Sequence, residues 1–318
     1  MAIVETSLSR SIKFWILLAF QIPSISCSIF LLYNSLCFRI NRRSIPNHVI
    51  TLMLLIGFFS VTFDLSITMN YLHEGFVKFQ TRSFCLFWMY IDYTLYASGI
   101  LLTAWASIER HILVFSIQYF RSTSQKIYFH YLPILVLLIY PFIFYACTIF
   151  IYPCDITELN FNQTLCGSPC FKCQSPILNW YDMLIHSVLP CTIIVTFSLV
   201  LLIRVIKHKR QIQQQFFSWR RQRRLVRQLL SITCLYISMN MPLFIIILIQ
   251  QCCDATFART EHGLYLFYLY YFLVLLLPFV CLQSLGGLKK KCRQMNCHLI
   301  ENRSRIQPLE RLKRRHDS

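Results

Sequence analysis

Long apolar stretches alternate with short polar stretches along almost the whole chain. Seven apolar windows stand out, at residues 14–38, 48–72, 84–108, 131–152, 183–203, 225–249 and 264–285. A bilayer core about 30 Å thick is crossed by roughly 20 residues of helix, so each window is long enough to span it. The windows are too long and too uniformly apolar for the alternating strands of an outer-membrane barrel. The pattern therefore predicts an all-α membrane protein, a bundle of seven transmembrane helices.

The first window resembles a signal peptide in its basic flank, Arg10 and Lys13, and in the small residues from Ser24 to Ser28. A signal peptide has an apolar region of about 7 to 15 residues, and this window is longer. We therefore expect residues 14–38 to remain as the first span.

Composition and charge agree with a membrane protein and set an expected orientation. The chain is 56% hydrophobic and 14% charged, and most of its 31 lysines and arginines follow the first, third and fifth windows or lie in the tail. By the positive-inside rule, residues 1–13 are expected outside the cell, and a tail of residues 286–318 with a short amphipathic helix is expected in the cytoplasm. The net charge of +18 then indicates contact with membrane lipids, and no motif indicates nucleic acid.

The third window carries charged residues at a helical spacing. Asp92 lies 18 residues before Arg110, in the stretch AWASIERHILVF at the window's end. Eighteen residues make five turns of an α-helix, so both side chains lie on one face, and Cys85 lies close to the same face. Because charge is costly in lipid, we expect this face to point into the bundle.

These residues resemble a known signature. Glu109, Arg110 and His111 are similar to the Asp/Glu-Arg-Tyr motif that ends the third helix of rhodopsin-like (class A) G-protein-coupled receptors. Cys85 stands at the family's spacing for the cysteine that binds the second outer loop. The family's helix-bending prolines of spans 5, 6 and 7 are matched by Pro190, Pro242 and Pro278. The resemblance covers roughly residues 12 to 297 and is greatest to divergent invertebrate orphan receptors.

The chain also departs from this family at several positions. Asn240 replaces the tryptophan that usually stands two residues before the proline of span 6, and span 7 reads Leu-Pro-Phe-Val-Cys in place of Asn-Pro-x-x-Tyr. No acid stands near Gly57, where the family keeps its sodium-binding aspartate. The resemblance therefore does not extend to sodium regulation or to the usual switch residues.

The resemblance implies roles at both ends of the third helix. Glu109, Arg110 and His111 would couple to a heterotrimeric G protein, with Arg110 paired to Glu109 at rest. Asp92 would bind a cationic group of an extracellular ligand, either a basic peptide or a cationic small molecule, with Tyr271 bonded to it. Pocket candidates beside these two are Tyr96, Asp64 and Asn240. A structural role for Asp92, satisfied by Tyr271, Tyr96 or water, stays open.

Cysteines and one sequon suggest covalent modifications. The resemblance implies a disulfide from Cys85 to Cys166 or Cys170. Asn162, in Asn-Gln-Thr, is expected to be glycosylated. Cys292 and Cys297 follow three lysines just past the last span, which suits palmitoylation, although unmodified thiols fit equally well.

Other classes of protein are less favoured. The sequence contains no His-Glu-x-x-His motif and no phosphate-binding glycine loop, so we expect neither an enzyme nor a bound metal or cofactor. Span 7 has no lysine for a retinal Schiff base. A multi-span transporter with Asp64 and Asp92 in an ion or solute path is the alternative, although we see no internal repeats. The predicted function is a receptor at the plasma membrane.

Overall fold

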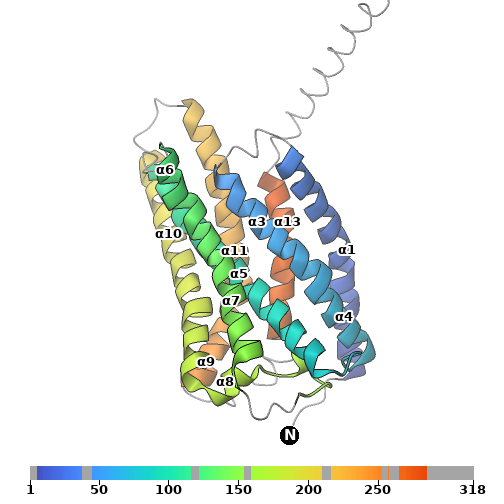
Figure 1. Ribbon diagram of the computed structural model, residues 1–318. Helices are drawn as coiled ribbons and strands as arrows, with labels where there is room; N and C mark the ends of the chain where they lie inside the picture. Colours follow the sequence, from blue (N-terminus) through green and yellow to red (C-terminus); the bar gives the residue numbers. More distant parts are fainter. Residues whose placement is uncertain are drawn as a thin grey trace, which may run out of the picture.

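The computed structural model describes residues 6–37, 45–115, 122–153, 159–209, 216–252, 257 and 265–284, and in these ranges the chain is helical with no strand (Figure 1). Six helical stretches are long and apolar enough to cross a membrane: Ser7–Cys37, Asn47–Glu74, Arg82–Leu113, Thr123–Ile151, Pro176–Arg204 and Leu230–Gln250. A shorter apolar helix, Leu266–Leu282, follows them. The predicted helical bundle is confirmed. The tail from 286 onward, with Cys292 and Cys297, lies outside the described residues.

Several of these stretches combine α-helix with single π-helical turns. The long α-helices are α1 (Ser7–Cys37), α3 (Ile45–Phe59), α4 (Leu65–Glu74), α5 (Arg82–Phe115), α7 (Leu132–Ala146), α10 (Leu189–Lys209), α11 (Phe216–Cys252) and α13 (Leu269–Ser284). The π-turns are η1 (Ser60–Asp64), η3 (Ile127–Tyr131), η4 (Cys147–Ile151) and η6 (Leu184–Val188). Short pieces complete the chain: α6 (Thr123–Lys126), η5 (Thr164–Cys166), α8 (Cys170–Gln174), α9 (Pro176–Met183) and η7 (Leu266–Tyr268).

The first helix is longer than its apolar window. The window begins at Phe14, whereas α1 begins at Ser7 and includes Arg10 and Lys13. Long basic side chains can keep their charge at a polar edge while their stems pack on apolar neighbours. The Lys13 ammonium lies 4.8 Å and 4.7 Å from the ring centres of Tyr265 and Tyr268. The start of α1 is therefore joined to the segment before α13 by cation–π contacts.

Helix α5 is the central helix of the bundle. It packs against α3, α7, α10 and α11, while α13 packs between α1 and α11 (Figure 1). In an apolar stretch of 18 residues within α5, 61% of the residues are buried, a larger share than in the corresponding stretch of the other long spans described. The outer helices instead expose apolar side chains such as Trp15 (63%), Phe30 (56%) and Ile143 (59%), as expected where a helix faces lipid.

Two π-turns carry polar residues into the bundle. A π-turn adds about one residue to a helical turn and so rotates the following residues by about 100°. Turn η1 carries the buried Asp64, and η6 carries the buried His186 just before Pro190. Pro190 has no backbone N–H to donate to the carbonyl four residues earlier, which favours a locally rearranged helix. The other two matched prolines, Pro242 and Pro278, lie inside α11 and α13.

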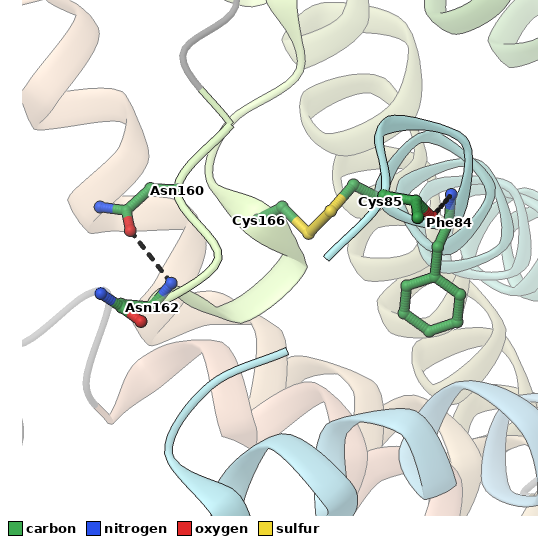
Figure 2. Close-up of a disulfide and its surroundings, with 6 residues drawn as sticks. Phe84, Cys85, Asn160, Asn162 and Cys166 are labelled. Carbon is green, nitrogen blue, oxygen red and sulfur yellow. Dashed lines mark hydrogen bonds between the residues drawn. A yellow bond between two sulfur atoms is a disulfide. The ribbon is translucent and has the colours of Figure 1, made fainter. Parts of the chain in front are cut away.

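A disulfide joins the start of α5 to the loop before α8. Cys85 bonds to Cys166, with Cα atoms 5.8 Å apart (Figure 2). Of the two partners left open by the sequence, Cys166 is therefore the one observed, and Cys170 is also disulfide-bonded. Asn162 is exposed beside this bond, and its backbone N–H donates to Asn160 Oδ1 at 3.0 Å (Figure 2). We call this part of the bundle the disulfide end, and the opposite part the Arg110 end.

Replacing both Cys85 and Cys166 with alanine is expected to lower the free energy of unfolding by about 2 to 4 kcal/mol, because the bond closes a loop between distant residues. Circular dichroism during heating of the purified protein in detergent micelles measures this. Cys173→Ala is the matched control, since Cys173 is a free, exposed cysteine of the same loop. Equal unfolding temperatures for the double variant and this control would contradict the prediction.

Candidate functional site

The expected inner face of α5 is buried along its length. Cys85 is 0% exposed, Asp92 6% and Arg110 3%, so the residues brought onto one face by their spacing all point into the bundle. A buried charge requires partners that replace its hydration. Those partners come from other helices and form two separate groups, one at each end of α5.

At the Arg110 end, Glu109 is bonded to a histidine from another helical stretch. Glu109 Oε1 contacts Nδ1 of His130 in η3, and both residues are fully buried. The other ring nitrogen of His130, Nε2, lies 3.0 Å from Nδ1 of His48 near the start of α3. Because His130 uses one ring nitrogen for each neighbour, Glu109, His130 and His48 form a continuous polar series across three helical stretches.

Arg110 and His111 lie next to this series. Arg110 interacts electrostatically with the neighbouring Glu109 carboxylate, so the resting partner that the resemblance implies for Arg110 is shared with His130. Arg204 Nη1 in α10 donates to His111 Nε2 at 3.1 Å. The three residues of the signature are thus joined to two neighbouring helices. Their role in G-protein coupling stays a prediction.

Toward the disulfide end, two carboxyl groups lie together inside the bundle. Asp64 accepts a hydrogen bond from Trp88 Nε1 at 3.0 Å. Asp92 interacts with both Asp64 and the hydroxyl of Tyr271, and that hydroxyl lies 2.8 Å from Thr68 Oγ1. Neither Asp64 Oδ2 nor Asp92 Oδ1 has a hydrogen-bond partner among the described residues. Neighbouring buried carboxylates repel each other, so a positive charge nearby would stabilise the pair.

The other two pocket candidates differ in how near they lie to this pair. The ring centre of Tyr96 lies 5.1 Å from that of Tyr270, which precedes Tyr271 in α13. Asn240 donates to the carbonyl oxygen of Tyr236 at 3.2 Å and lines a small cavity between α10 and α11. Tyr96 therefore lies near the carboxyl pair, whereas no described contact joins Asn240 to that pair.

A second acidic group at the disulfide end was not expected from the sequence. Lys172 of α8 forms an ion pair with Asp182 of α9, with Nζ 2.8 Å from Oδ2. The same ammonium lies 4.4 Å from the ring centre of Tyr93 in α5. Asp182 Oδ1 accepts from the Tyr145 hydroxyl at 2.6 Å and lies 2.9 Å from His186 Nδ1. Four helical stretches therefore meet around this ion pair.

The charge of Lys172 is stabilised by this environment. Partial burial disfavours the ammonium, but the Asp182 carboxylate and Tyr93 outweigh that effect and raise the pKa of Lys172 above its usual value. Lys172 therefore stays protonated at neutral pH. Its charge also acts on Asp92, so one loop lysine lies between the two acidic groups of the disulfide end.

The missed residues share a position at the edge of an apolar window. His130 immediately precedes the fourth window and Asp182 the fifth, and both are buried. A window chosen for low charge begins just after such residues, and the window therefore does not indicate that they are buried. One signal was available, since Asp182 and His186 are four residues apart and so share a helix face.

No group of three or more histidine, cysteine, aspartate or glutamate side chains within the described ranges is arranged to hold a metal ion. The contacts described at both ends of α5 are ion pairs and hydrogen bonds. This suits reversible binding and exchange of partners.

A family of known proteins matches most of the chain. The family described as 7 transmembrane receptor (rhodopsin family) matches residues 30–282. No curated protein matches the chain.

The contact between Glu109 and His130 gives a stability prediction. His130→Ala is expected to lower the free energy of unfolding by about 3 to 5 kcal/mol, the usual effect of leaving a buried charge without its partner. His48→Ala is the matched control. It is expected to cost about 1 kcal/mol, because the bond from His130 to Glu109 remains. Thermal unfolding in micelles compares the two variants, and equal losses would argue against the assigned partnership.

Proposed function

Because the chain belongs to the rhodopsin family of seven-transmembrane receptors, we propose that it binds an extracellular ligand carrying a cationic group and activates a heterotrimeric G protein. The observation that carries this proposal is the burial of an acid and an arginine on one face of α5, near opposite ends of the helix. A single rigid element then connects a ligand-binding end to a coupling end.

Membership of the family establishes the general class of protein. The chain is a multi-pass membrane protein and a signalling receptor. Extracellular ligands and G proteins are the general partners of the family, its members are typically found in the plasma membrane, and they are generally not enzymes. The ligand class, the G-protein contact and the roles of individual residues are the proposal.

The proposed orientation of the bundle in the membrane rests on the distribution of charge. We take the disulfide end as extracellular and the Arg110 end as cytoplasmic. Most lysines and arginines lie in the loops and tail on the Arg110 side, which the positive-inside rule assigns to the cytoplasm. The disulfide and the exposed Asn162 beside it support an outer location for the other end, because disulfides and N-glycans form on that side.

Asp92 and its neighbours support a cationic ligand. Asp92 and Asp64 together carry two carboxyl groups with oxygens that have no hydrogen-bond partner among the described residues. Tyr271 contacts both and offers a hydroxyl. An ammonium or guanidinium group supplies the positive charge, and its N–H groups can donate hydrogen bonds to these oxygens.

Glu109, Arg110 and His111 support coupling at the other end. Arg110 carries a fixed positive charge and several donors, so it can leave one acceptor for another when neighbouring helices move. Glu109 is also bonded to His130. The Glu109 carboxylate therefore keeps a partner when the Arg110 guanidinium moves away from it. A G-protein segment that presents backbone carbonyls or a carboxylate suits such a donor.

Arg110→Ala is expected to remove ligand-stimulated nucleotide exchange while the amount of receptor at the cell surface stays unchanged. A coupling free energy between two sites is commonly worth about 5- to 150-fold, so the loss should be at least of that order. The ligand comes from a library of peptides and amines screened on cells with a promiscuous G protein. Lys78→Ala, an exposed lysine at the disulfide end, is the control. Normal exchange in the arginine variant, or ligand-dependent solute flux through vesicles, would overturn the proposed coupling.

Asp92→Asn is expected to weaken ligand potency by about 10- to 150-fold, because a hydrogen bond to a charged group is worth about 1.5 to 3 kcal/mol. The measurement is the concentration of the screened ligand that gives half-maximal signalling. Glu74→Gln removes an acid that is exposed at the same end and serves as the control. Unchanged potency in the Asp92 variant would show that this acid is structural.

A further inference from the structure

The loop that carries Lys172 is held close to the bundle. It leaves the disulfide of Cys166, and Cys170 at the start of α8 is itself disulfide-bonded. Phe171 is fully buried and its ring lies 6.4 Å from that of Phe144 in α7. These anchors directly precede Lys172 and hold its backbone close to the bundle, while the long side chain extends inward to Asp182.

Asp182 is a carboxylate whose contacts are complete only when a cation is present. Its side chain is 6% exposed. Oδ1 is used by Tyr145 and His186, and Oδ2 by Lys172. Without the ammonium, a buried charge would lose the partner that offsets its lost hydration, which is strongly unfavourable.

The cation in this group comes from a loop and not from a helix of the bundle. The side chain of Lys172 keeps 26% of its surface exposed, whereas that of Asp182 is 6% exposed, so the lysine reaches the carboxylate from the solvent side. A flexible four-carbon stem can withdraw without moving the helices that supply Asp182, Tyr93, Tyr145 and His186. The acceptor group therefore persists when the lysine leaves.

We propose that Asp182, Tyr93, Tyr145 and His186 form a binding site for a primary ammonium group, which Lys172 occupies in this structure and which an ammonium group of the ligand takes over on binding. The existence of the site is independent of the proposed function. Only the identity of the natural occupant as the receptor's ligand rests on it.

The contacts suit an ammonium group that carries N–H donors, as the primary ammonium of Lys172 does, and exclude a quaternary one. The 2.8 Å separation between Nζ and Oδ2 is that of a charge-assisted N–H···O bond, which a quaternary ammonium cannot donate. The ammonium also lies over the face of the Tyr93 ring, whose π electrons attract the positive charge. Because Lys172 also acts on Asp92, a ligand ammonium here would lie near the carboxyl pair as well, and a ligand with two amines could contact both groups.

Chemical rescue tests the site without knowledge of the natural ligand. Lys172→Ala removes three carbons and the nitrogen, which n-propylammonium replaces atom for atom. The full-length variant is purified in micelles, and its unfolding temperature is measured against n-propylammonium chloride at constant ionic strength. At ten times its Kd, the probe should raise the ratio of folded to unfolded protein about 11-fold.

Three comparisons make the rescue specific. Tetramethylammonium chloride should give no saturable rise, because it has no N–H. The double variant Lys172→Ala with Asp182→Asn should not respond to n-propylammonium. Lys78→Ala, which removes an exposed lysine elsewhere, should behave as the wild type, whose site is already occupied.

The proposal is overturned if n-propylammonium does not stabilise the Lys172 variant, or if tetramethylammonium or the double variant gives the same rise. If Lys172→Ala does not accumulate as folded protein, its amount at the surface of cells grown with n-propylammonium becomes the readout. No increase there, relative to cells grown with tetramethylammonium, also overturns it. These measurements involve no G protein, so a failure of the site and a failure of coupling through Arg110 are observed separately.

Discussion

The rest of the structure depends on partners for the acidic side chains that are buried around α5. A helix at the centre of a membrane bundle cannot turn its polar groups to water, so each charge must find a partner on a neighbouring helix. Glu109 finds His130, Asp64 finds Trp88, and Asp182 finds Lys172. These partners lie on different helical stretches, and each contact therefore fixes how two of them pack. The polar groups specify the arrangement of helices whose apolar surfaces would otherwise pack in many ways.

The two ends of α5 solve this requirement with different chemistry. At the Arg110 end the acceptor Glu109 is fully buried and its partner is a ring nitrogen on an equally buried residue. At the disulfide end the cation Lys172 belongs to a loop and remains partly in contact with solvent. The first arrangement resists exchange with solutes, whereas the second permits it. This difference matches the expectation that one end holds a resting state and the other meets ligands.

Apolar windows were sufficient to predict the bundle, because the length and composition of a span follow directly from the thickness of the bilayer. The 18-residue spacing likewise predicted that Asp92 and Arg110 share a buried face. The helices extend beyond the apolar windows, as the start of α1 at Ser7 shows, because a helix can continue past the apolar part of its sequence. His130 and Asp182 were missed because hydropathy treats a polar residue as a boundary, while a partner from a distant helix can bury it. The choice of Cys166 over Cys170 likewise depended on the path of a loop.

The π-turns at Ser60–Asp64 and Leu184–Val188 also affect how this receptor is aligned with others. A position counted from the middle of a regular helix shifts by about one residue beyond such a turn, which moves the side chain to an adjacent face. Residue-by-residue transfer of pocket positions in spans 2 and 5 therefore has to be done separately on each side of the turn. Chimeric receptors that exchange the outer halves of these helices should be joined outside the turns, so that the extra residue is inherited whole.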